Sequence, residues 1–118
     1  MTPPVSSEIS QQITRLDDGE IVGLVAYDEA NDNWQPQTIF GFPLADSMSK
    51  VAAADFLLTS GMAILAQRWE FAEQGDWFSC EFVEVHPNEV TVRITDYGHA
   101  DVHQFRTLRD PLHDMRRG

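Results

Sequence analysis

The spacing of apolar residues predicts a helix near the N-terminus, followed by a strand. Four apolar residues lie at steps of four, four and three, as on one face of a helix: Val5, Ile9, Ile13 and Leu16. Ser6 or Ser7 is suited to cap this helix, and Gly19 is suited to end it. Residues 21–27 form a short apolar run with β-branched side chains, which predicts a buried strand.

The next segments predict a loop, a second strand and a second helix. Residues 28–36 are rich in the turn-forming residues Asp, Asn and Pro, so we expect a loop there. Residues 37–42 are then predicted to form a strand that could pair with the first. Apolar side chains at intervals of four within residues 46–60 predict a helix, which Gly61 is suited to end.

Residues 62–74 carry signals of both kinds. Their content of Ala, Leu, Met, Gln and Glu favours a helix that continues past Gly61. Residues 68–71 instead alternate as in a strand, and residues 73–76 are typical of a hairpin turn. We predict a strand here, which gives a sheet of six strands; a helix would leave five.

The C-terminal third has the clearest strand pattern. Residues 77–85 are aromatic and β-branched, and residues 86–89 are typical of a tight turn. Residues 90–94 alternate between apolar and polar, as in a half-buried strand. Residues 102–108 predict a weaker final strand. The fold class is therefore α+β: a mainly antiparallel five- or six-stranded sheet with two helices packed on one face.

The length predicts one domain. The 118 residues form a single globular domain in this interpretation, with residues 1–5 and 112–118 flexible. No internal repeat or low-complexity linker divides the chain.

The charge balance favours a basic partner. Nineteen Asp and Glu residues stand against eight Lys and Arg, a net charge of −11. Such a surface repels nucleic acid and anionic membranes, whereas it attracts a basic protein. The excess is greatest in residues 1–49, where eight acids accompany one base, Arg15. The plainer interpretation is that the acidity keeps the protein soluble.

The single cysteine and the N-terminal residues predict a cytoplasmic protein. Cys80 has no partner for an intramolecular disulfide. The first residues lack the basic and apolar regions of a signal peptide, and no apolar run is long enough to span a membrane.

A polar segment near the C-terminus contains the one candidate metal site. If the last strand begins early, His99, Asp101 and His103 share one face, and two imidazoles with a carboxylate suit zinc or non-haem iron. Gly98 indicates instead that these residues lie in a solvent-exposed turn. We favour the turn, and so expect neither a metal nor another cofactor.

The chain has no recognisable catalytic motif. It contains no Gly-rich phosphate loop, G-x-S-x-G, H-E-x-x-H or C-x-x-C. Cys80 alternates with Phe78 and Phe82, which predicts a buried side chain and not a nucleophile. We therefore expect a protein that is not an enzyme.

The predicted loop 28–36 contains the candidate partner-binding residues. Three acids accompany a tryptophan there: Asp28, Glu29, Asp32 and Trp34. Tryptophan is a common anchor in interfaces, and carboxylates pair with Lys or Arg of a partner. The alternative is that Trp34 packs on the sheet and the acids only solubilise the loop.

These features predict a small acidic intracellular protein-binding module. An inhibitor or immunity-type protein that binds a basic partner protein fits a compact domain without a catalytic motif. One alternative is a metal-binding protein or small metal-dependent enzyme that uses His99, Asp101 and His103. Another is a structural subunit of a phage-derived or homo-oligomeric assembly, in the simplest case a homodimer.

Overall fold

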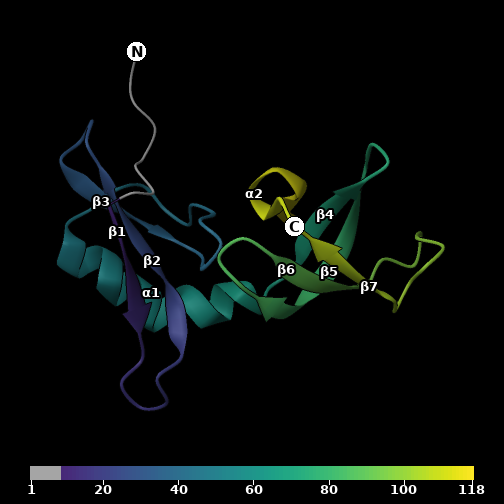
Figure 1. Cartoon of the computed structure of the whole chain (residues 1–118), viewed down its shortest axis with the longest axis horizontal. Helices are drawn as coiled ribbons and strands as arrows, with labels where there is room; N and C mark the ends of the chain where they lie inside the picture. Colours follow the sequence, from purple (N-terminus) through teal and green to yellow (C-terminus); the bar gives the residue numbers. More distant parts are fainter. Residues whose placement is uncertain (1–8) are drawn as a thin grey trace. The chain divides into compact units, whose positions relative to one another are not determined.

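The computed structural model describes residues 9–118 and confirms the α+β class (Figure 1). Within this range the strands form one three-stranded and one five-stranded sheet, both antiparallel. The strands are thus divided between two sheets, where we predicted one. The chain divides into two compact units, Met1–Met62 (unit 1) and Ala63–Gly118 (unit 2). The single-domain organisation stays a prediction.

Unit 1 contains the three-stranded sheet, with β2 in the middle. β1 (Ser10–Thr14), β2 (Ile21–Asp28) and β3 (Asn33–Gln37) lie in the order β1-β2-β3. The strand predicted at residues 21–27 is confirmed. Val25 and Ala26 are fully buried, so β2 supplies much of the core of this unit.

The predicted N-terminal helix is wrong in its described part, because residues 10–14 form β1. Two residues of its apolar stripe are not buried by the fold: the exposed fraction is 46% for Ile9 and 101% for Leu16. A short helix without a buried face is marginal, whereas β1 satisfies the backbone groups of β2. The proposed caps Ser6 and Ser7 lie outside the described residues, as does the segment 1–5 that we expected to be flexible.

β3 lies earlier than the strand predicted at residues 37–42, within the predicted loop. A four-residue turn after Asp28 brings Asn33 opposite it and starts the β2–β3 hairpin. Residues 38–42 turn instead: Thr38 N donates to Phe42 O (2.8 Å), and Gly41 has a φ of +89°. β3 is the outer strand of its sheet, a place that tolerates proline, and Pro36 lies within it.

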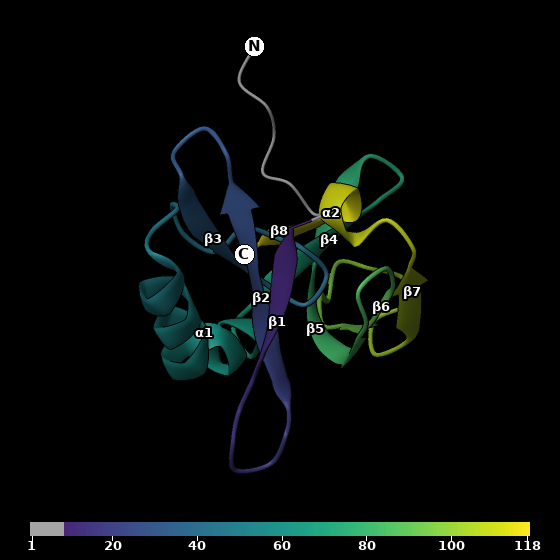
Figure 2. The same ribbon diagram turned by 60° about the vertical axis from the view of Figure 1, so that its left-hand side comes forward.

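α1 (Lys50–Leu65) is the predicted second helix, displaced toward the C-terminus. Ser49 precedes it and caps it, because Ser49 Oγ accepts a hydrogen bond from Ala52 N (3.2 Å). Gly61 does not end the helix. A Cβ at Gly61 would lie 2.5 Å from Val22 O, so the glycine allows α1 to approach β2 closely. Within unit 1, α1 lies beside β2 (Figure 2).

Unit 2 contains the five-stranded sheet, in the order β7-β6-β5-β4-β8. The strands are β4 (Trp69–Glu73), β5 (Asp76–Val85), β6 (Val90–Ile94), β7 (Phe105–Leu108) and β8 (Met115–Arg117). The predictions for residues 77–85 and 90–94 are confirmed, and the last predicted strand is shortened to β7. Segment 62–74 is helical at its start and a strand from Trp69, so our prediction was correct only for its second part.

The C-terminal tail, which we expected to be flexible, forms a one-turn helix and an outer strand. α2 (Pro111–Asp114) follows Asp110, and β8 then pairs with β4. Met115 is only 2% exposed, so burial of this side chain holds the tail on the sheet. The predicted layer of two helices on one face is not confirmed. No helix in residues 9–118 combines the length and hydropathy needed to cross a bilayer.

Candidate functional site

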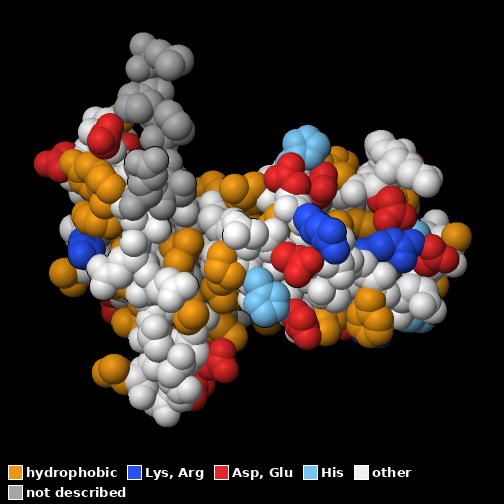
Figure 3. All heavy atoms as spheres, in the orientation of Figure 1, with side chains coloured by type: hydrophobic (Ala, Val, Ile, Leu, Met, Phe, Trp, Pro, Cys, Tyr) orange, Lys and Arg blue, Asp and Glu red, His pale blue; other side chains and the backbone are white. Residues whose placement is uncertain are grey.

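The arginines of unit 2 are largely engaged by carboxylates of the same unit. The ion pairs are Arg93–Glu81, Arg106–Glu73, Arg106–Asp101, Arg109–Glu89 and Arg116–Glu70. In Figure 3, blue side chains over this unit accordingly lie beside red ones. Much of the charge of unit 2 is therefore balanced within its own surface.

Unit 1 leaves most of its carboxylates without a cation. In its described residues the one ion pair joins Arg15 to Asp18, and Lys50 lies over the Trp34 ring, 4.8 Å from its centroid. Seven carboxylates in this range make no ion pair: Asp17, Glu20, Asp28, Glu29, Asp32, Asp46 and Asp55. The negative charge available to a partner is therefore concentrated on unit 1.

Asp28 ends β2 and organises the turn that follows. Its Oδ1 accepts a hydrogen bond from Ala30 N (3.1 Å), and its Oδ2 accepts from Asn31 Nδ2 (2.7 Å) and Ser47 Oγ (2.6 Å). The bond from Ser47, followed by that from Asn31, holds the pKa of Asp28 below its usual range. Asp28 is 7% exposed, so it is an ionised carboxylate built into the fold.

A polar pocket of about 400 Å³ opens beside Asp28, and we call it the acceptor pocket. Its lining residues are all polar: Asp28, Asn31, Asn33, Gln35, Asp46 and Ser47. Asp46 is exposed, and no described Lys, Arg or His lies within ion-pair distance of either carboxylate. Two carboxylates and three amide oxygens form a site rich in acceptors, which suits a cation with several N–H donors.

The predicted partner-binding residues divide between this pocket and the packing of unit 1. Asp28 lines the pocket but is satisfied internally, and Glu29 is exposed outside its lining. Asp32 Oδ1 accepts from Tyr27 Oη (2.7 Å). Trp34 is half-buried against Tyr27, with ring centroids 5.4 Å apart, so part of the tryptophan packs within unit 1.

Two lining residues from the segment before α1 were not predicted as site residues. Asp46 and Ser47 were interpreted as the start of a helix, whereas they lie beside β3. Backbone pairing of Trp34 with Met48 places them there, with Trp34 N donating to Met48 O (2.7 Å) and Met48 N to Trp34 O (2.8 Å). No short-range pattern reveals this pairing, because the two segments are joined by the irregular turn at residues 38–42.

The lowered pKa of Asp28 predicts a pH-dependent contribution to stability. A folded-state pKa below the unfolded value contributes stability that is present above about pH 4 and lost as the pH falls through the folded pKa. Asp28→Asn should therefore lower the urea midpoint at neutral pH and differ less from wild type near pH 3. Urea titrations at the two pH values, with Glu29→Gln as an unaffected control, measure this. A difference in urea midpoint between Asp28→Asn and wild type that is equal at both pH values would contradict this prediction.

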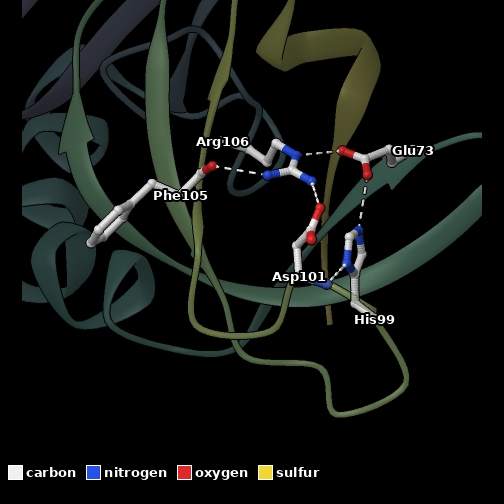
Figure 4. Close-up of polar contacts among 5 residues, drawn as sticks. All are labelled: Glu73, His99, Asp101, Phe105 and Arg106. Atoms are coloured by element: carbon white, nitrogen blue, oxygen red, sulfur yellow. Dashed lines mark hydrogen bonds and ion pairs between the residues drawn. The ribbon is translucent and has the colours of Figure 1, made fainter.

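The candidate metal residues lie in the loop between β6 and β7, where His99 and Asp101 belong to one polar network with Glu73 and Arg106 (Figure 4). His99 Nε2 bonds Glu73 Oε1 (2.9 Å), and His99 Nδ1 accepts from Asp101 N (2.9 Å). Asp101 pairs with Arg106, which also donates to Glu73 Oε2 (2.9 Å). Burial would raise the pKa of Glu73, but the bonds from Arg106 and His99 outweigh it and hold the pKa lowered.

This geometry does not assemble a metal site. Both nitrogens of His99 are occupied, and its side chain, 8% exposed, packs edge-on against Phe78 with centroids 4.5 Å apart. His103 lies in a turn with a φ of +73° and packs against Tyr97 instead. In residues 9–118 no three His, Cys, Asp or Glu side chains are arranged to hold a metal ion. His99 and Asp101 of this loop contact Glu73 of β4 and Arg106 of β7, so they link the loop to both strands.

Cys80 is buried, as its alternation with Phe78 and Phe82 predicted. It is 2% exposed, and burial raises the pKa of its thiol to about 12. A thiol with that pKa is protonated at neutral pH and unsuited to nucleophilic attack.

Comparison with known proteins gives no guide to the site: no protein family, curated protein or solved structure matches the chain.

Proposed function

We propose that this protein is a small acidic binding module, of the inhibitor or immunity type, that binds a basic partner protein. The observation that carries the proposal is the acceptor pocket, whose two carboxylates, Asp28 and Asp46, have no cation beside them in residues 9–118. We place the protein in the cytoplasm and assign it no catalytic activity. Both parts of that assignment follow from the sequence alone.

A partner arginine fits the pocket best. A guanidinium group has five N–H donors, enough to meet Asp46, the amide oxygen of Asn33 and the second lone pair of Gln35 Oε1, which already accepts from Gln37 Nε2 (2.9 Å). The uncompensated carboxylates elsewhere on unit 1 would attract the basic partner before contact and so raise the association rate. Asp28 keeps its internal hydrogen bonds and acts mainly as a fixed negative charge.

A titration with small probes tests this assignment. We expect N-acetylarginine amide to shift the NMR signals of Asn31, Asn33 and Gln35, with N-acetyllysine amide weaker and N-acetylglutamate amide without effect. Asp46→Asn should weaken arginine binding about tenfold, because it removes an exposed charge-assisted hydrogen bond. Asp76→Asn removes an exposed carboxylate of unit 2 and should leave binding unchanged.

The proposal fails if arginine and glutamate amides shift the same signals equally, or if Asp76→Asn weakens binding as much as Asp46→Asn does. Raising the salt from about 50 mM to about 0.5 M should also weaken the binding, since screening is nearly complete at the higher concentration.

A further inference from the structure

α1 exposes a line of apolar side chains along unit 1, which we call the α1 seam. Its apolar members are Val51, Leu58 and Met62, and Asp55 lies between the first two. The four positions are spaced by four, three and four residues and therefore share one face of the helix. Val51 is 81% exposed, Leu58 47% and Met62 39%. Three large apolar side chains thus line one exposed helix face at helical spacing.

The other face of α1 is already used by the fold. Ala53 and Leu57 are completely buried, and Gly61 lies against Val22. The helix carries only two charged residues, Lys50 and Asp55, so it is apolar on nearly all sides. A helix of that composition is normally covered on all sides. A contiguous exposed apolar patch commonly marks a contact surface.

The charges on the seam indicate the kind of partner. Asp55 lies between Val51 and Leu58 and makes no ion pair with any cation in residues 9–118. Lys50, at the start of the helix, is held over the Trp34 ring. The one available charge on the seam is therefore negative, and a partner that covers it must supply a cation at that point to avoid burying an unpaired carboxylate.

We propose that the α1 seam binds an amphipathic helix of the basic partner, with a Lys or Arg opposite Asp55. The seam extends over about 16 Å, the length of three helical turns, which matches a short partner helix with apolar residues at the same spacing. A second copy of this chain is a poor occupant, because two bodies of charge −11 repel each other. The proposal rests on the proposed function only in assigning this helix to the basic partner protein; the apolar face and the charge opposite Asp55 are argued from α1.

A designed helical peptide of leucine and lysine is the probe. We expect it to bind the wild-type protein in a fluorescence titration, and Leu58→Gln/Met62→Gln to weaken binding roughly 30-fold through lost apolar burial. Both positions are exposed and glutamine is a good helix former, so the variant should fold normally. Val83→Gln/Leu112→Gln changes two exposed apolar residues of unit 2 and serves as the matched control.

Three outcomes would overturn the inference. The first is equal weakening in the seam variant and the unit 2 control, which indicates nonspecific attraction to an acidic protein. The second is equal binding of a leucine–glutamate peptide, which removes the role of Asp55. The third is a wild-type dimer in light scattering that the seam variant abolishes, which makes a second copy the occupant. The arginine-amide titration of the seam variant separates this inference from the proposed function, because the acceptor pocket is unaltered there.

Discussion

Replacing Trp69 by alanine should lower the free energy of unfolding by about 4 kcal/mol, the largest effect we expect from a single substitution. Trp69 is completely buried, and its ring lies edge-on to Phe82 with centroids 5.2 Å apart. Its Nε1 also donates to Ile64 O (3.0 Å). The alanine variant would leave a large cavity and remove one of the two hydrogen bonds that Ile64 O accepts, while the bond from Gln67 N (3.1 Å) remains.

Urea denaturation followed by circular dichroism measures this loss, and Trp77→Ala is the matched control. Trp77 lies on the neighbouring strand β5, where it is only half-buried beneath the Arg116 guanidinium, 4.3 Å from its ring centroid. Its removal should cost about 1 kcal/mol, as for an exposed cation–π contact with modest burial. Equal losses of unfolding free energy in Trp69→Ala and Trp77→Ala would contradict the burial of Trp69 in unit 2.

Replacing Gly23 by alanine should lower the free energy of unfolding by about 3 kcal/mol, the second large effect. Gly23 has a φ of +153°, which other residues rarely adopt. An added Cβ would also collide with Gln37 O of β3 and would lie 2.8 Å from Leu57 Cδ2 of α1. The strand and the helix approach this point from two sides, so neither can easily move away.

Gly19→Ala separates backbone strain from crowding in the same denaturation experiment. Gly19 also has a positive φ, +72°, but nothing lies within 4 Å of an added Cβ. Its replacement should cost about 1 kcal/mol, the strain alone. If Gly19→Ala and Gly23→Ala lost the same stability, the close packing of α1 on β2 would be wrong.

Strand patterns in the sequence predicted the elements that depend on local alternation. Residues 21–27, 77–85 and 90–94 were predicted as strands, and each is one; every one of them contributes buried side chains to its sheet. The turn at residues 73–76 was also predicted, and Gln74 and Gly75 both have positive φ, as this hairpin requires.

The errors arose where long-range contacts outweigh local preference. β1 carries no alternating pattern and forms because β2 needs a neighbour on that side. Gly61 was interpreted as a helix end, yet its role is to let α1 approach Val22, a contact between segments about 40 residues apart. β8 follows a short helix and depends on pairing with β4, which no pattern in the tail predicts.

The candidate site was predicted in part. Turn-forming and acidic residues indicated the loop that begins at Asp28, and that loop lines the acceptor pocket. The role of Asp28 was not foreseen, because its bond from Ser47 joins residues 19 positions apart. For Trp34 the sequence left two interpretations open, an interface anchor or a side chain packed on the sheet, and in the structure its ring contacts Tyr27 and Lys50. The composition predicted an excess of negative charge in the N-terminal half. The structure shows which of these carboxylates make no ion pair.

The most direct test of a basic partner is affinity capture from a lysate of the native host, at low and high salt, with the bound proteins identified by mass spectrometry. We expect the wild type and Asp76→Asn to retain a basic protein at low salt, and Asp46→Asn to retain much less of it. High salt should release it in every case. Retention of the same protein regardless of salt and of Asp46 would contradict binding at the acceptor pocket.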